Sequence, residues 1–120
     1  RNTNFKYFLK KLNNKKYFVD YSLDGISNYA FPIILNNQNI KYRDKFEKYL
    51  TYNQIEFRRG NAGGGNQVRQ PYLKKYKSQK NLNKLTNVDI VHFYGYYIGN
   101  YPDLSMKKIN TLIKILNNFS

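Results

Sequence analysis

The sequence predicts an α+β domain, in which helices pack on one face of a small antiparallel sheet. Three segments repeat apolar residues at the spacing of one helical face, and shorter apolar or aromatic runs are typical of strands. The elements follow in the order helix, strand, helix, strand, loop, strand, helix, which is an α+β order. At 120 residues the chain has the size of a single domain with one core.

Two elements are expected before residue 40. Asn4 can cap a short amphipathic helix, and residues 17–21 are interpreted as a strand or an extended lead-in to a turn. The nearly unbroken apolar run at residues 29–35 is expected of a strand covered on both faces. Pro32 implies that the backbone nitrogen at this position points away from a partner strand. The apolar face of the first helix consists of Phe5, Phe8, Leu9 and Leu12.

A second amphipathic helix is predicted over residues 41–52. On its polar face, oppositely charged side chains four residues apart can form ion pairs across a turn. These pairs are Arg43 with Glu47 and Asp44 with Lys48. The opposite, apolar face consists of Tyr42, Phe46, Tyr49 and Leu50.

The second half of the chain completes the predicted sheet. Residues 55–59 are expected to form a short strand, residues 72–85 an irregular lysine-rich helix, and residues 89–98 the central strand. Ser105 is expected to cap the last helix. The buried stripe of that helix is predicted to be Met106, Ile109, Leu112, Ile113 and Leu116.

A glycine-rich loop follows the predicted strand at residues 55–59. Four glycines within residues 60–65 permit positive φ and close approach of a ligand to the backbone. Arg58, Arg59 and Arg69 are three of the five arginines in the chain, and each can fork two hydrogen bonds onto a phosphate or carboxylate. Asn66 and Gln67 add donors and acceptors. The loop is interpreted as an anion-binding element, with an ordinary surface hairpin as the alternative.

Composition narrows the classes of function. The net charge of +14 and the isoelectric point near 9.9 are typical of proteins that bind nucleic acid or an anionic membrane. The lysines are scattered, however, so a solvated basic surface is favoured and a nucleic-acid-binding module stays the alternative. No apolar run approaches the roughly 20 residues of a membrane span, which predicts a cytoplasmic protein without a membrane partner. The absence of cysteine and the single histidine argue against a metal site.

No catalytic residue is predicted within the chain. The seven acidic residues form no convincing acid and base pair, and His92 is the only histidine. In the predicted central strand, His92 is either a hydrogen-bonded core histidine or a group that points toward the same cleft as the glycine loop. The loop also lacks the spacing of the phosphate-binding motifs of nucleoside triphosphatases and dinucleotide-binding enzymes.

Four segments occur together in the order and spacing of a known family. They are residues 27–33 (SNYAFPI), 41–46 (KYRDKF), 57–72 and 92–100 (HFYGYYIGN). In this combination the chain resembles the C-terminal domain of the DegT/DnrJ/EryC1/StrS family of sugar aminotransferases and dehydratases. The resemblance covers nearly the whole chain.

The resemblance implies a fold-type-I enzyme that depends on pyridoxal 5′-phosphate and acts on a nucleotide-linked 4-keto-6-deoxy sugar. It implies a homodimer with active sites at the subunit interface, which supplies sugars for surface polysaccharides. Residues 1–120 would then be a single C-terminal small domain. The large N-terminal domain, with the cofactor and its Schiff-base lysine or the histidine of the dehydratase branch, is expected outside this chain. The chain alone is therefore expected to be inactive.

Within this resemblance, Arg59, Asn66, Gln67 and Arg69 are expected to line the mouth of the active site against the sugar nucleotide. His92 and Asn100 are expected as further site-lining residues. The Arg-Gln-Pro sequence at residues 69–71 and the Gly-Asn pair at residues 99–100 resemble the 3-dehydratase branch. The glycine insertion at residues 63–65 is atypical of the better-known members of either branch, so aminotransferase and dehydratase both stay open.

Overall fold

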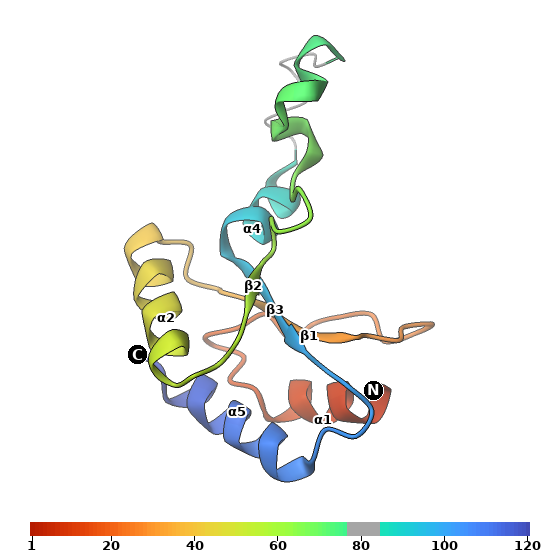
Figure 1. Ribbon diagram of the computed structural model, residues 1–120, viewed down its shortest axis with the longest axis vertical. Helices are drawn as coiled ribbons and strands as arrows, with labels where there is room; N and C mark the ends of the chain where they lie inside the picture. The colour runs from red at the N-terminus through yellow and green to blue at the C-terminus, as the bar shows by residue number, and fades with distance from the viewer. Residues whose placement is uncertain (77–84) are drawn as a thin grey trace.

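The computed structural model describes residues 1–76 and 85–120, and it confirms the predicted α+β class (Figure 1). Helices cover one face of a small sheet, and the other face of the sheet is uncovered. Two 3-10 helices follow the glycine-rich loop. The elements are α1 (Asn2–Lys11), β1 (Ala30–Ile34), α2 (Ile40–Tyr52), β2 (Arg58–Arg59), η1 (Gln67–Arg69), η2 (Pro71–Tyr76), α4 (Thr86–Tyr94), β3 (Gly95–Gly99) and α5 (Met106–Asn118).

The sheet has three antiparallel strands in the order β1-β3-β2. Tyr97 of the central strand β3 lies opposite Pro32 on one side and Arg58 on the other. Leu35 donates its backbone N–H to the carbonyl oxygen of Tyr94. In an antiparallel pair, alternate residues of a strand bond to the same neighbour, so the residues in register with Leu35 bond to β3. Pro32 is out of register with them, and its nitrogen therefore points to the open edge of the sheet. The sequence-based expectation for Pro32 is therefore confirmed.

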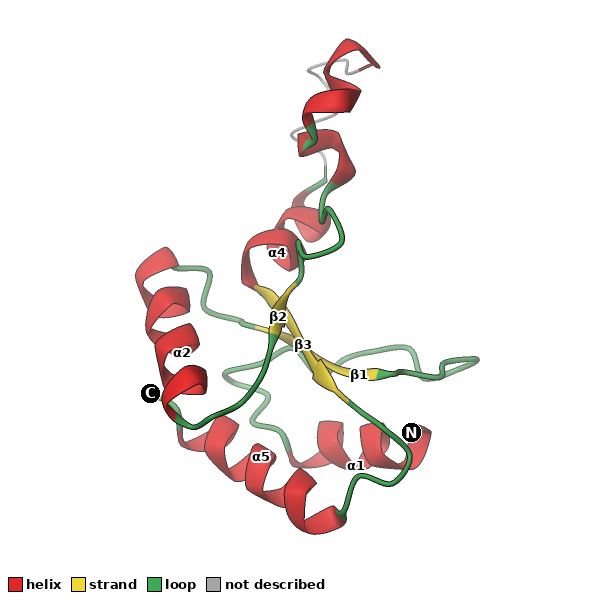
Figure 2. Cartoon of the chain, viewed as in Figure 1, coloured by secondary structure: helices red, strands yellow, loops and turns green. Residues whose placement is uncertain are grey.

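The core lies between one face of the sheet and the helices α1, α2 and α5 (Figure 2). Phe31 and Ile33 of β1 and Tyr96 and Ile98 of β3 point into it, because side chains alternate between the two faces of a strand. Phe46 of α2 is fully buried among three aromatic rings. These are the rings of Tyr17, Tyr96 and Phe119, at centroid distances of 6.0, 5.4 and 5.2 Å.

The predicted central strand at residues 89–98 is wrong in its first half. Residues 86–94 form the helix α4, and only residues 95–99 form β3. Asp89, His92 and Phe93 are spaced i, i+3 and i+4, so a helix turns all three toward the glycine loop, whereas a strand would point His92 and Phe93 to opposite faces. The negative charge of Asp89 in the first helical turn also stabilises the helix, because it lies near the positive end of the helix dipole.

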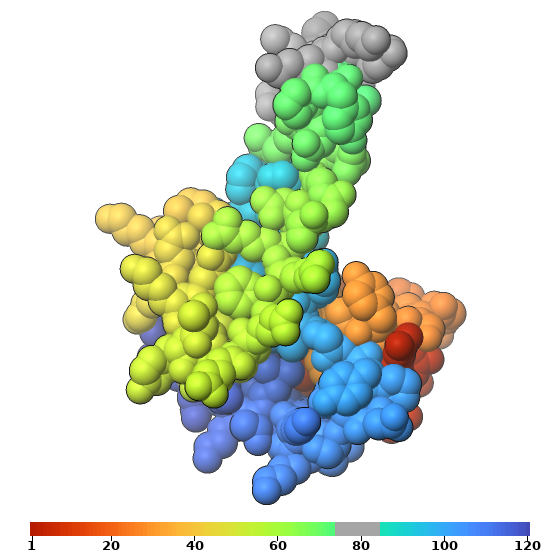
Figure 3. All heavy atoms as spheres, in the orientation of Figure 1, coloured from red at the N-terminus to blue at the C-terminus, as the bar shows by residue number. Residues whose placement is uncertain are grey.

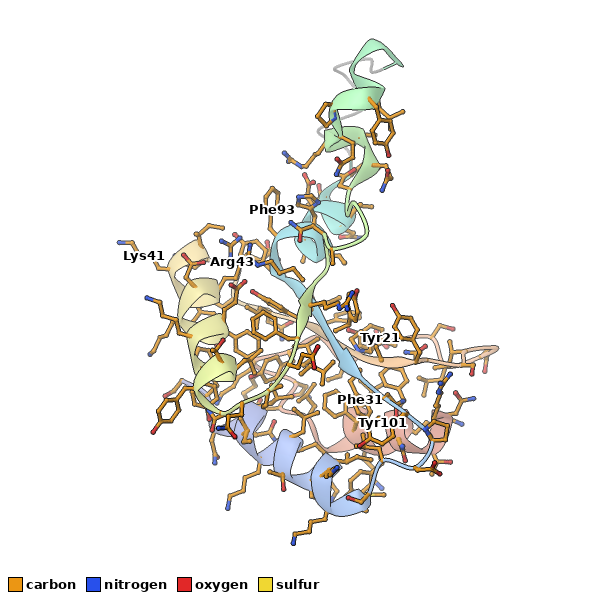
Figure 4. All side chains as sticks on the ribbon, in the orientation of Figure 1. Tyr21, Phe31, Lys41, Arg43, Phe93 and Tyr101 are labelled. Atoms are coloured by element: carbon orange, nitrogen blue, oxygen red, sulfur yellow. The ribbon has the colours of Figure 1, made fainter. Side chains whose placement is uncertain are left out.

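One predicted helix cap and one predicted ion pair are also corrected. The first helix begins at Asn2 with Arg1 at the N-cap position, and Asn4 instead donates its amide to Asn100 at 3.2 Å. Arg43 pairs with the adjacent Asp44 at 2.9 Å rather than with Glu47. Figure 4 shows Arg43 beside Phe93 of α4, whose carbonyl oxygen accepts from the guanidinium at 3.5 Å.

The remaining predictions agree with the structure in part, and of the strand predicted over residues 55–59 only β2 (Arg58–Arg59) forms. Ser105 caps α5 as expected, but Met106 is 44% exposed and lies outside the buried stripe of that helix. Tyr17 forms only an isolated bridge with Leu35, so residues 17–21 are not a strand. Of the irregular helix predicted over residues 72–85, η2 accounts for the start, and residues 77–84 lie outside the described residues.

Two general findings concern membranes and metals. Among the described residues, no helix is both long and apolar enough to cross a bilayer. The described part of the chain also contains no group of three His, Cys, Asp or Glu side chains that could hold a metal ion.

Candidate functional site

The glycine loop and α4 meet in one hydrogen-bonded group, which we call the loop cluster: Asn66, Arg69, Asp89, His92 and Phe93. The Asp89 carboxylate accepts from Arg69 Nε and Nη2 at 2.7 and 2.8 Å, and from the Asn66 amide at 2.7 Å. The Arg69 guanidinium lies 4.9 Å from the centre of the Phe93 ring. A two-point ion pair and a ring contact therefore fix the direction of Arg69.

Asn66 connects the backbone of the loop to α4. Its side chain is buried, with only 2% exposed, and its Oδ1 accepts from Val68 N–H at 3.2 Å, which caps η1. Its backbone N–H donates to His92 Nδ1 at 2.9 Å. Because Nδ1 accepts, the neutral imidazole of His92 carries its proton on Nε2. That N–H is the donor that His92 retains for another partner.

Gly60, Gly65 and Gly95 are required by close packing on α4. A Cβ added at Gly60 or Gly95 would lie 2.2 or 2.4 Å from the carbonyl oxygen of Val91. Gly65 has φ of +58°, and a Cβ there would lie 2.3 Å from His92 Nδ1. Only Gly63 of the predicted insertion has open space around it. The loop is thus packed against the helix, and an unsupported surface hairpin does not describe it.

Asp89 is expected to make the loop cluster sensitive to acid. The hydrogen bond from Arg69, assisted by that from Asn66, lowers the pKa of Asp89 from 3.8 to about 2, against the opposing effect of burial. Because the folded-state pKa lies below the unfolded one, ionised Asp89 stabilises the fold above about pH 4 and loses this effect as the pH falls toward 2. We expect Asp89→Asn to flatten the pH dependence of stability over this range in urea denaturation; an unchanged pH dependence would contradict the assignment.

Arg59 lies outside the loop cluster. It forms a two-point ion pair with Glu47 of α2, with Nε–Oε1 and Nη2–Oε2 distances of 2.9 and 2.6 Å. The buried Tyr96 hydroxyl donates to the same carboxylate at 2.8 Å. Burial, and then the Glu47 carboxylate, raises the pKa of Tyr96, which keeps this hydroxyl protonated. Arg59 therefore connects β2 to α2.

The three arginines of the loop segment do not share one pocket. Arg58 and Arg59 are adjacent in β2, so their side chains point to opposite faces of the sheet. Arg59 and Arg69 have different carboxylate partners, Glu47 and Asp89. The expectation of a single anion pocket formed by three guanidinium groups is corrected by this geometry.

The other predicted site residues are placed as follows. Gln67 is exposed beside the loop cluster and accepts a hydrogen bond from the Tyr72 hydroxyl. Asn100 lies at the far end of β3 from His92 and is 1% exposed. Its amide donates to the carbonyl oxygens of Arg1 and Asn28 at 3.1 and 3.2 Å, so it holds the N-terminal segment in place.

The uncovered face of the sheet carries a pocket that the sequence reasoning missed. It has a volume of about 470 Å³, and its lining residues are Tyr29, Glu56, Phe57, Arg58, Tyr97 and Gly99. Arg58 forms no ion pair with any described residue. The sequence contained one signal for this pocket, because side chains two residues apart in a strand share a face of the sheet. This rule assigns Glu56 and Arg58 to a common face, and likewise Tyr97 and Gly99.

η2 extends beyond α4 as an arm at the top of the view, and the body of the molecule lies below it (Figures 1 and 3). The chain is thus a small α+β domain with two polar features: the packed loop cluster at one end of β3, and a pocket on the uncovered sheet face.

This architecture is similar to part of a solved enzyme structure. The structure is a GDP-4-keto-6-deoxymannose-3-dehydratase with a trapped PLP-glutamate geminal diamine. The similarity covers 96% of this chain and 30% of that chain, with a TM-score of 0.73 and 22% sequence identity. At this identity the match establishes the fold, and the chain spans under a third of the length of the enzyme it matches. No protein-family model and no curated protein matches the chain.

Proposed function

We propose that this chain is the C-terminal small domain of a pyridoxal-phosphate-dependent enzyme acting on a nucleotide-linked 4-keto-6-deoxy sugar. The observation that supports this proposal is the structural similarity over nearly the whole chain to a sugar-nucleotide dehydratase. The reaction is either amino transfer or 3-dehydration. We further propose a cytoplasmic homodimer that supplies sugars for surface polysaccharides.

The described residues do not by themselves form a site for pyridoxal phosphate. Lysines whose side chains are described are exposed except for Lys16, which is half-buried. The Lys16 ammonium donates to the carbonyl oxygens of Asn117 and Phe119, so it ties the N-terminal segment to the end of α5. We therefore propose that the cofactor-binding residues belong to a larger domain outside this chain. When bound there, the cofactor supplies an electron sink for carbanion chemistry.

The proposed contribution of this chain is to border the substrate site with Asn66, Gln67, Arg69 and His92. Arg69 is paired with Asp89, so the loop cluster is close to electrically neutral and suits neutral hydroxyl groups better than a phosphate. Arg69 still has N–H donors beyond the Nε and Nη2 bonds to Asp89. Arg59 and Asn100 hold other parts of the fold together, and we propose no substrate contact for them.

A direct test is to assay the full-length protein with GDP-4-keto-6-deoxymannose, with glutamate as amino donor. We expect binding of pyridoxal phosphate, measured by visible absorbance, and consumption of the sugar nucleotide. An amino sugar product identifies the transferase reaction, and a 3-deoxy product identifies the dehydratase. Absence of cofactor binding together with DNA binding that falls steeply with salt would instead favour the nucleic-acid-binding module.

Arg69→Ala in the full-length enzyme is expected to raise KM for the sugar nucleotide about tenfold, because the substrate loses hydrogen bonds from the remaining N–H donors of a charged group, which are stronger than those between neutral groups. Lys107→Ala, which removes an exposed cation of α5, is the matched control and should leave KM unchanged. An unaltered KM in Arg69→Ala would contradict the placement of the loop cluster at the substrate.

A further inference from the structure

The pocket on the uncovered sheet face is lined by aromatic rings and has free space at Gly99. Tyr97 and Gly99 are two residues apart in β3 and so share this face. The ring of Tyr29 meets that of Tyr97 edge-on, with centroids 6.1 Å apart. No atom lies within 4 Å of a Cβ added at Gly99. The missing side chain at Gly99 therefore leaves free space beside the Tyr97 ring.

The rim of this pocket carries charges that no described residue neutralises. Arg58 and Glu56 both line the pocket, and neither forms an ion pair with a described residue. By contrast, Arg59 and Arg69 are each held by a carboxylate. Of the three arginines in the loop segment, Arg58 is therefore the one with no carboxylate partner among the described residues, so its charge and its full fork of donors are open to an external anion.

These groups match the parts of a purine nucleotide. Aromatic rings present faces and edges against which a base can pack, and a guanidinium group can fork onto a phosphate. A carboxylate accepts hydrogen bonds but donates none. The Watson–Crick edge of guanine offers two adjacent N–H donors, whereas uracil has one N–H donor flanked by two carbonyl oxygens, which a carboxylate would repel. The pocket volume of about 470 Å³ suits a small ligand.

We propose that this pocket binds the nucleotide end of the sugar nucleotide, with the base against Tyr97 and Tyr29, Glu56 on the N–H donors of guanine, and Arg58 on the diphosphate. This inference rests on the proposed function and assigns a separate part of the substrate to a separate surface. The loop cluster borders the sugar, and the uncovered sheet face recognises the nucleotide.

The first test adds a side chain to the pocket. In the full-length protein, Gly99→Val is expected to weaken binding of free GDP at least about tenfold, measured by calorimetry, because the added side chain occupies the ligand space. Gly63→Val is the matched control, since Gly63 also has no atom within 4 Å of an added Cβ. Its affinity for GDP is expected to stay within about twofold of the parent.

The second test separates the recognition of base and phosphate. Arg58→Gln is expected to weaken GDP about tenfold and to leave the binding of guanosine unchanged, because guanosine carries no phosphate. Glu56→Gln is expected to reduce the preference for GDP over UDP. Lys48→Gln, which removes an exposed cation of α2, controls for the loss of one positive charge. These variants also test the proposal if Gly99→Val does not fold.

The outcomes distinguish this inference from the proposed function. Turnover of the sugar nucleotide with unchanged GDP affinity in Arg58→Gln and Gly99→Val overturns the nucleotide site and leaves the enzyme assignment standing. Weaker GDP binding in Gly63→Val than in Gly99→Val also overturns it, because the nucleotide would then lie at the glycine loop. Pocket-dependent GDP binding without cofactor binding or turnover supports the nucleotide site and contradicts the enzyme assignment.

Discussion

Phe46→Ala is expected to lower the free energy of unfolding by about 4 kcal/mol, the largest effect expected of any single substitution here. The side chain is fully buried, and its ring contacts the rings of Tyr17, Tyr96 and Phe119. Truncation removes the apolar contacts and leaves a cavity that three rigid rings cannot readily fill. The measurement is urea denaturation followed by circular dichroism.

Tyr52→Ala is the matched control for Phe46→Ala. It truncates an aromatic side chain in the same helix, but Tyr52 is 86% exposed, so the expected change in stability is below about 0.5 kcal/mol. Similar losses in the two variants would show that α2 does not pack on the sheet through Phe46.

Gly60→Ala has the second largest expected effect, a loss of about 3 kcal/mol in the free energy of unfolding. The added Cβ would lie 2.2 Å from the backbone carbonyl oxygen of Val91 in α4, and backbone cannot rotate away as a flexible side chain can. The helix must shift, and the loop cluster, which depends on Asp89 and His92 of the same helix, must shift with it. Urea denaturation measures the loss.

Gly63→Ala provides the comparison for Gly60→Ala within the same loop. An added Cβ at Gly63 meets no atom within 4 Å, so stability is expected to change by less than about 0.5 kcal/mol. If both variants were neutral, the glycines would serve loop freedom rather than close packing on α4, and the packed arrangement described above would be wrong.

The pairing of arginines with carboxylates has a functional consequence. Arg59 and Arg69 are tied to Glu47 and Asp89, so they order β2 and the glycine loop rather than offering bare positive charge. Arg58 has no carboxylate partner among the described residues. A net charge of +14 therefore says little about where a substrate phosphate binds, because the local carboxylates decide which cations are available.

Much of the fold was predictable from local pattern. Helical periodicity identified α2 and α5 within a residue or two of their bounds, since each presents a continuous apolar stripe to one sheet. The failure at α4 has a physical cause. Residues 89–98 are rich in Ile, Val, Phe and Tyr, which suit either a strand or a buried helix, and the packing of α4 against the glycines decided the outcome.

The candidate site was predictable only in part. The sequence indicated that the loop around Asn66 and Arg69 matters, but it assigned His92 to a strand and passed over Asp89, which holds the cluster together. It also did not separate Arg58 from Arg59, because adjacent arginines look alike until a strand turns them to opposite faces.

The sequence by itself determined the α+β class, the helices α2 and α5, the strand β1 and the position of the glycine loop, because these depend on spacing between near neighbours. Tertiary structure alone decided that α4 is a helix, which carboxylate each arginine meets, and that an uncovered sheet face forms a pocket. Those features join residues up to 70 positions apart, as Tyr29 and Gly99 of the pocket illustrate (99 − 29 = 70), and local propensity carries no information about such pairs.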